Sequence, residues 1–229
     1  VTLPYTFTNI YSSKDGYMYA TTTTDTPPQV RKINIGGSDV LYGAYDFRDN
    51  SIMSSYAGVN QIFCDVTVDA YNNMLIVDRQ YGRVYEYDDR GNNLFAFGTK
   101  GTGYGQLSYP VSIESFAKVE INENGDEEIK DLRVFVLNKE TGNITVFKPT
   151  EFADLVHKAN ALYSAGKYDE AQTKWDEVLT KNNYYTLALV NKGNILLRQD
   201  KNIEAYECFE EAENATFASE AYEERRAQF

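Results

Sequence analysis

Few residues in this sequence have the type and spacing that catalysis or metal binding requires. His157 is the only histidine, and neither a Ser-His-Asp triad nor a Cys-His pair can be assembled around it. The two cysteines, Cys64 and Cys208, are far apart, and no group of residues has the ligand spacing of a zinc site. The sequence therefore predicts no catalytic residue, no metal site and no cofactor.

Two other stretches look like ligand-binding loops at first sight. The glycines between Gly98 and Gly105 have a spacing close to that of a dinucleotide loop, but they lead to Tyr109 and a strand instead of a helix. A second stretch, around Gly125, is rich in oxygen ligands that could hold calcium, although it does not match the EF-hand pattern. Its members are Asn122, Asn124, Asp126, Glu127, Glu128 and Asp131. We interpret the first as a connector between strands and the second as a solvated hairpin tip, with calcium binding as the alternative.

Composition limits the classes of partner. The formal net charge is -12, and an acidic chain without a basic patch repels phosphate backbones and anionic membrane surfaces. We therefore expect no nucleic-acid partner. No apolar stretch approaches the length of a membrane span. The chain opens on Val1 without a signal peptide, so we expect it to be a segment of something longer.

A period of 34 residues organises the C-terminal region. Small residues recur where two helices would cross, and a large ring recurs where it would fill the space between hairpins. The matching pairs are Leu155 and Leu189, Ala159 and Gly193, Leu162 and Leu196, Ala171 and Ala205, and Trp175 and Phe209. The pattern resembles the tetratricopeptide repeat (TPR) over about residues 152–215, followed by a capping helix at about 216–228. We expect Trp175 and Phe209 to be buried.

This resemblance also implies a binding site. Asn160 and Asn194 occupy one position on successive repeats, and Tyr163, Leu197 and Arg198 lie one turn further along the same face. The concave face of tetratricopeptide arrays binds extended peptides, and an asparagine amide there can both donate to and accept from a peptide backbone. The five residues are therefore predicted to bind a peptide. The alternative is that the asparagines are structural, in a spacer without a ligand.

The first 150 residues follow a different period. Residues 62–69 alternate between apolar and polar side chains, and turn signals separate them from further short strands at 74–78, 83–87 and 94–98. Related patterns recur on both sides, with second strands near residues 18, 75 and 134. We therefore expect three consecutive four-stranded antiparallel sheets, arranged as an open arc.

These units resemble blades of NHL-repeat β-propellers. The match is best from Cys64 to Ile113, where it includes Asp78, Gly82-Arg83-Val84, Asp89-Arg90-Gly91, Phe97-Gly98 and Tyr109-Pro110. Propellers generally need about four to eight blades to close. The resemblance therefore implies either that upstream blades are missing or that another copy completes the arc. Propeller enzymes similar to gluconolactonases and lyases place metal-binding carboxylates on first strands, where this chain has Asp65 and Glu114. The alternative interpretation of both is a solvent-facing strand residue.

The junction between the two patterns is short. Pro149 follows the last expected strand, fixes its own φ and disfavours a helical Lys148. Thr150 can then cap the first helix through its hydroxyl.

Together these observations predict a multidomain β + α chain. Residues 1–149 form NHL-like β-propeller blades, and residues 150–229 form two TPR-like helical hairpins plus a capping helix. The combination resembles bacterial cell-envelope proteins that continue into a membrane domain. It implies a non-enzymatic scaffold that binds protein or peptide partners, or glycans, outside the cytoplasm, tethered to a membrane by a segment beyond this chain. The alternative function is a divalent-metal-dependent propeller enzyme of the gluconolactonase or lyase type, with the repeats as an accessory.

Overall fold

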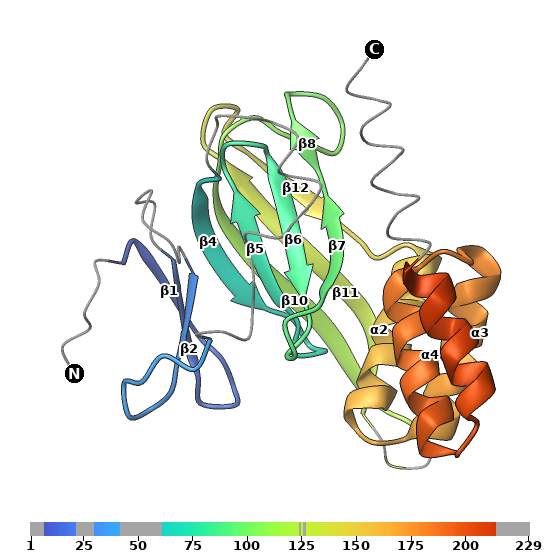
Figure 1. Cartoon of the computed structure of the whole chain (residues 1–229). Helices are drawn as coiled ribbons and strands as arrows, with labels where there is room; N and C mark the ends of the chain where they lie inside the picture. The colour runs from blue at the N-terminus through green and yellow to red at the C-terminus, as the bar shows by residue number, and fades with distance from the viewer. Residues whose placement is uncertain (1–6, 22–29, 42–60, 124, 126, 214–229) are drawn as a thin grey trace. The chain divides into compact units, whose positions relative to one another are not determined.

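The computed structural model describes residues 7–21, 30–41, 61–123, 125 and 127–213. Mostly antiparallel sheets precede a set of helices (Figure 1), as the predicted β + α class requires. The chain divides into two compact units between Lys148 and Pro149. The described residues up to Lys148 are called the β unit below, and those from Pro149 the helical unit.

Three antiparallel sheets follow one another in the β unit. The first sheet contains β1 (Asn9–Ser12), β2 (Met18–Thr21) and β3 (Val30–Ile33). The middle sheet contains β4 (Phe63–Val68), β5 (Met74–Asp78), β6 (Arg83–Tyr87) and β7 (Asn93–Phe97). The last sheet contains β10 (Pro110–Ile121), β11 (Glu127–Asn138) and β12 (Asn143–Phe147). The middle sheet has the four strands that the sequence predicted, whereas the described residues of the other two sheets form three strands each, and not four.

The hairpin turns of the middle sheet use side-chain oxygens in place of backbone partners. Asp69 Oδ1 accepts from the backbone N–H of Tyr71 at 2.9 Å and of Asn73 at 2.8 Å. Asp88 repeats this arrangement in the turn between β6 and β7. Its Oδ1 accepts from the backbone N–H of Arg90 at 3.0 Å and of Asn92 at 2.8 Å. Such turns keep the chain in register because aspartate hydrogen-bonds to the backbone two residues on.

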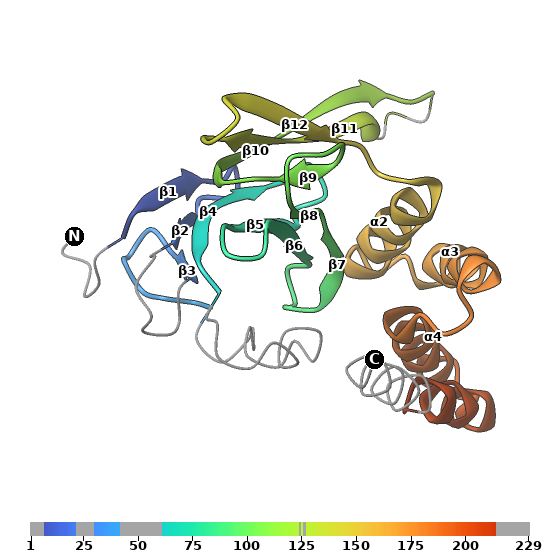
Figure 2. The same ribbon diagram turned by 90° about the horizontal axis from the view of Figure 1, so that it is seen from above.

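The middle and last sheets pack face to face around a shared core. Leu75, Val77 and Val84 of the middle sheet pack with Val134 and Val136 of the last sheet. The opening strands β1, β4 and β10 of the three sheets lie side by side, β4 being in contact with both of the others. Figure 2 shows the sheets succeeding one another in chain order. This is a propeller-like arrangement, in which each sheet acts as a blade.

A short parallel pair connects the middle and last sheets. It consists of β8 (Thr99–Lys100) and β9 (Gln106–Leu107). The glycine-rich stretch lies within it and leads to a strand, so its interpretation as a connector is confirmed. Gly82 marks a close approach here, because a Cβ at its φ of +61° would meet the Lys100 backbone nitrogen at 2.9 Å.

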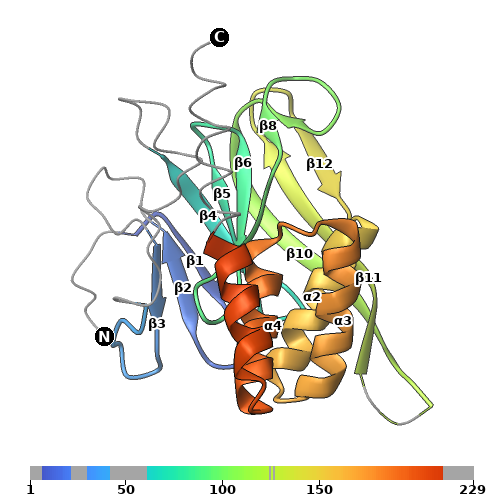
Figure 3. The ribbon, with the colours of Figure 1, turned by 45° about the vertical axis from the view of Figure 1, so that its right-hand side comes forward.

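The helical unit consists of α2 (Glu151–Ser164), α3 (Tyr168–Lys181), α4 (Thr186–Arg198) and a further helical stretch at 202–213 (Figure 3). Thr150 caps α2 as predicted, with its Oγ1 accepting from the Ala153 backbone N–H at 3.2 Å. Gly166, with φ +75°, follows the end of α2. The predicted capping helix at 216–228 lies outside the described residues. Among the helices that the structure describes, none is long and apolar enough to cross a membrane.

The small and large residues of the 34-residue period pack as their types require. Trp175 and Ala171 of α3 are fully buried, as is Ala159 of α2. Phe209 is partly buried, and its ring lies so close to Gly193 that a Cβ there would approach it to 2.7 Å. The burial expected for Trp175 is therefore confirmed, and Phe209 is covered in part.

Candidate functional site

The predicted carboxylates on the opening strands serve the contact between two sheets. Asp65 Oδ2 accepts from the Ser112 hydroxyl at 2.8 Å and from the Ile113 backbone N–H at 2.9 Å. Its other oxygen accepts from the Val66 backbone N–H at 3.0 Å. Asp65 is buried, and its hydrogen bonds tie β4 to β10. The interpretation of Asp65 as a solvent-facing residue is wrong, because its carboxylate joins the middle sheet to the last one.

Glu114 is the exposed member of this pair. Its Oε1 accepts from the Thr67 hydroxyl at 3.1 Å and from the Ser115 backbone N–H at 3.1 Å. Tyr11 of β1 donates from its hydroxyl to the Val68 carbonyl at 3.3 Å, and burial raises the pKa of that phenol. Polar groups from β1, β4 and β10 thus run along the strands that open the three sheets.

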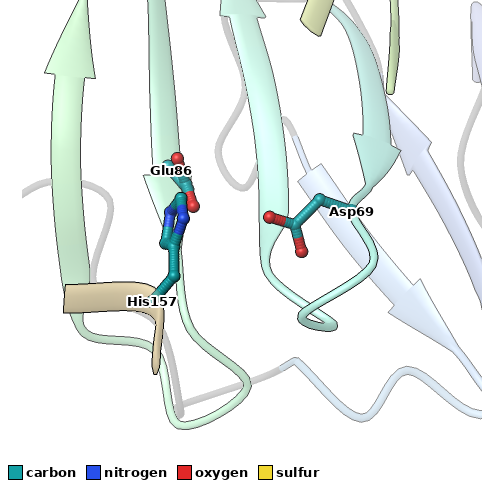
Figure 4. Close-up of side chains that lie close together, drawn as sticks. All are labelled: Asp69, Glu86 and His157. Carbon is teal, nitrogen blue, oxygen red and sulfur yellow. The ribbon is translucent and has the colours of Figure 1, made fainter. Parts of the chain in front are cut away.

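A second pair of carboxylates in the β unit was not predicted from the sequence. Asp69 and Glu86 are both buried in the middle sheet, and one oxygen of each lies within 4.8 Å of the other (Figure 4). The Asn73 amide nitrogen donates to both, at 3.3 Å to Asp69 Oδ2 and at 3.0 Å to Glu86 Oε1. Two carboxylate oxygens at this separation are hard ligands that suit a divalent cation. One signal in the sequence could have identified this pair, because Glu86 is a charged residue between the aromatic residues Tyr85 and Tyr87 of a strand.

The hairpin tip around Gly125 pairs its charges with cations of the protein. Asp131 contacts Arg133 at 2.8 Å and Lys148 at 3.7 Å, and Glu128 contacts Lys130 at 2.5 Å. The Arg133 guanidinium holds the pKa of Asp131 below its usual range. Asn124 and Asp126 of this stretch lie outside the described residues. Glu128 and Asp131 are therefore engaged in ion pairs at a solvated tip.

Neither cysteine has the environment of a nucleophile. Both are free and buried. Burial raises the pKa of Cys64 to about 11 and also raises the pKa of Cys208. A thiol with a raised pKa is protonated near neutral pH, so it is neither a good nucleophile nor a ready metal ligand.

The predicted peptide-binding residues divide into buried and accessible members. Asn160 on α2 is only 5% exposed, whereas Asn194 on α4 is half-buried. Leu197 and Arg198 are exposed at the end of α4. His157, one turn before Asn160 on α2, is buried as well.

Two of these residues meet on a ring that the sequence did not single out. The Tyr168 ring, at the start of α3, lies 5.4 Å from the Tyr163 ring in an edge-to-face arrangement. The Arg198 guanidinium carbon lies 4.6 Å from the centre of the same Tyr168 ring, in a cation–π contact. The end of α2, the start of α3 and the end of α4 therefore converge on Tyr168. We call Tyr163, Tyr168, Leu197 and Arg198 the tyrosine–arginine cluster.

Comparison with known proteins gives few matches. No protein-family model and no curated protein matches the sequence. Among solved structures, virginiamycin B lyase from Staphylococcus aureus matches 62% of this chain and 55% of its own, at 16% identity and a TM-score of 0.32. An inactive variant of that lyase with quinupristin matches 65% and 58%, again at 16% identity and a TM-score of 0.32. A streptogramin B lyase structure has 11% identity and a TM-score of 0.26. The chain spans a little over half the length of the first two.

These comparisons correct one prediction. The sequence predicted a protein without enzymatic activity, whereas the solved structures that it resembles are those of a lyase. The prediction that the chain is not an enzyme is therefore withdrawn.

Proposed function

We propose that the helical unit is a TPR-like module that binds an acidic peptide segment of a partner protein at the tyrosine–arginine cluster. The β unit, built of NHL-like blades, would be the scaffold that presents it. The single observation that supports this function is the contact of Tyr163 and Arg198 with one ring, Tyr168. In keeping with the resemblance of the sequence, the proposed setting is the bacterial cell envelope, outside the cytoplasm and tethered to the membrane. A glycan is the alternative partner.

The geometry favours a carboxylate as the group recognised. The Arg198 guanidinium lies over the Tyr168 ring, and a guanidinium in a cation–π contact can still use its N–H donors for a carboxylate. Leu197, 44% exposed, adds an apolar surface next to that charge. Such a pair suits a peptide with an apolar residue beside an aspartate or glutamate. Asn194 is placed one turn earlier on α4, where its amide can hold a peptide backbone.

Fluorescence anisotropy tests this function. Labelled ten-residue peptides with alternating apolar and acidic residues are titrated with the protein, beside the same peptides with Asp and Glu replaced by Asn and Gln. We expect the acidic peptides to bind and Arg198→Gln to weaken them roughly tenfold or more, since a charged hydrogen bond contributes about 1.5–3 kcal/mol. Lys130→Gln, which removes one positive charge from the β unit, is the matched control. Equal binding by wild type and Arg198→Gln would exclude this site.

The carboxylate pair of the middle sheet favours a second candidate, a divalent-metal-dependent enzyme of the lyase type. Asp69 and Glu86 are buried and their oxygens are close enough to share a cation. We expect Mn²⁺ binding by calorimetry and consumption of quinupristin by mass spectrometry, both lost in Glu86→Gln and kept in Glu120→Gln, whose carboxylate is exposed. Wild-type protein that binds no Mn²⁺ and leaves quinupristin intact rejects this candidate.

A further inference from the structure

The middle sheet shows what covers the face of a blade in this protein. Its strands β4 and β5 are buried along their whole length; β4 contacts both the first and the last sheet, and β5 contacts the last sheet. On the side of the last sheet, Leu75, Val77 and Val84 are 0–1% exposed and pack against Val134 and Val136. A neighbouring sheet with branched apolar side chains is therefore the natural cover for this set of positions.

The last sheet repeats the geometry of the middle sheet sixty residues later. The β5–β6 hairpin pairs Asp78 with Arg83, and the β11–β12 hairpin pairs Asn138 with Asn143. The turns that these pairs close each contain a glycine with positive φ, +61° at Gly82 and +63° at Gly142. The two hairpins therefore correspond residue by residue.

This correspondence identifies equivalent positions that differ in burial. Val77 pairs with Val84 in the middle sheet, and Leu137 pairs with Ile144 in the last sheet. The first pair is fully buried, whereas Leu137 is 42% exposed and Ile144 is 59% exposed. The sequence keeps large apolar side chains at the two positions that the next sheet would cover.

The exposed side chains are part of a continuous apolar surface across all three strands. We call it the outer face, and its members are Phe116, Phe135, Leu137, Ile144 and Val146. Cross-strand pairing places Phe135 opposite Val146 and Leu137 opposite Ile144, so these residues share one side of the sheet. An antiparallel sheet with one solvated side alternates apolar and polar residues, whereas strands apolar on both sides are covered on both sides. The outer face thus has the composition of a contact surface.

The first sheet offers a much smaller open apolar surface. On the side that carries Ala20, Arg31 and Ile33 these three residues are buried, and the one exposed large apolar side chain among the described strand residues of this sheet is Ile10, which pairs with Ala20. A second copy of the chain would therefore meet the outer face with its own outer face. The polar members of that side have both signs, Glu114 opposite Phe135 and Arg133 opposite Phe116. A twofold contact between two such faces therefore does not require groups of like charge to lie opposite each other.

We propose that the outer face is the contact between two copies of this chain, which pack their last sheets face to face about a twofold axis. Each copy then supplies to the other the apolar cover that the last sheet supplies to the middle sheet. The contact is isologous, because the same residues lie on both sides of it. Phe135 and Val146 lie at its centre, Leu137 and Ile144 lie at one end, and Phe116 lies beside Arg133 at the other.

Analytical ultracentrifugation of the full chain tests this contact over about 1 µM to about 100 µM protein, because dimerisation depends on concentration. We expect wild type to sediment with twice the mass of one chain at the upper end. The double variant Leu137→Glu/Ile144→Glu should sediment as a single chain throughout. Both side chains are exposed within one copy, so circular dichroism should show an unchanged fold.

The matched control is Ile10→Glu/Ile35→Glu, which places two glutamates at exposed isoleucines of the first part of the β unit and should leave the dimer intact. A wild type that stays at the mass of one chain overturns the proposal, as does a dimer that survives Leu137→Glu/Ile144→Glu.

Discussion

At the scale of single residues, Trp175 is the largest fully buried side chain among the described residues. It is the only tryptophan of the chain and is fully buried, and its indole nitrogen has no hydrogen-bond partner in the described residues. We expect Trp175→Ala to cost roughly 3–5 kcal/mol in the free energy of unfolding, because a large side chain leaves a cavity. A urea melt followed by circular dichroism at 222 nm measures this.

Trp175→Phe is the companion variant. It keeps an aromatic ring and removes a buried N–H donor without a partner, so we expect a clearly smaller loss than for Trp175→Ala. Equal stability of wild type and Trp175→Ala would contradict the packing described for α3.

Asp78 is a second residue with a measurable consequence. It is fully buried, and burial raises the pKa of its carboxyl although Oδ1 accepts from the backbone N–H groups of Ile62 and Gln80. The folded state therefore holds this proton more tightly than the unfolded state, whose aspartates titrate near pH 3.9. As pH rises from that value through the raised pKa, ionisation of Asp78 lowers the stability of the folded state.

Asp78→Asn should remove this dependence. The corresponding residue of the last sheet is already an asparagine, Asn138. We expect the difference in unfolding free energy, variant minus wild type, to increase between about pH 3 and about pH 7. Urea melts at a series of pH values measure it, with Asp15→Asn as a control near the surface. A difference that is constant over this range would show that the buried carboxyl does not titrate in the window.

At the scale of elements, the start of α2 is set by one hydroxyl. Thr150 adopts extended φ and ψ of −74° and 166° and accepts from the Ala153 backbone N–H. Thr150→Ala leaves a first-turn donor without its cap, so we expect a loss of about 1 kcal/mol. Thr150→Ser keeps the hydroxyl and should lose far less. A thermal melt of the two variants compares them, and equal melting temperatures would argue against the cap.

Much of the element order was predictable, because local patterns determine it. The four strands of the middle sheet follow a period of two, and the small and large residues of the helices follow a period of 34. Thr150 followed from its position after Pro149. The extent of the flanking sheets did not follow, because their described residues pair into three strands through contacts that local sequence does not specify.

The candidate sites were less predictable than the elements. Asp65 has the spacing of a strand residue, but its burial depends on β10, which lies almost fifty residues away. Tyr168 was missed for a similar reason, since Tyr163 and Arg198 approach it from two other helices. The Asp69–Asn73 turn was detectable, because Asp88 and Asn92 repeat the same spacing. Periodicity identifies which face is buried and does not identify which polar groups meet there.

At the scale of the whole molecule, the unfolding of the two units can be compared. Asp65 joins two sheets of the β unit, and Trp175 lies in the helical unit. Asp65→Ala leaves the buried Ile113 N–H without its partner, so we expect a loss of about 1–3 kcal/mol in the stability of the β unit. The β unit contains no tryptophan, whereas both units contain tyrosines. Unfolding of the β unit is therefore followed by hydrogen exchange of the β4 and β10 amides, and that of the helical unit by Trp175 fluorescence. We expect only the first transition to move.

Glu114→Ala serves as the control for this comparison, because its carboxylate is exposed. If Asp65→Ala shifts the Trp175 transition by the same amount as the transition of the β4 and β10 amides, the two units unfold as one cooperative block.

The stacking of the sheets also constrains how the chain is made. The ribosome releases the middle sheet when Phe97 has emerged, but Leu75, Val77 and Val84 are covered only after Phe147 follows. Those roughly 50 residues take on the order of 3 to 10 s to synthesise. During that time the nascent chain carries a bare apolar β-surface of the kind that chaperones hold. Stalled chains that end between these two points should therefore be the forms most prone to aggregate during biosynthesis.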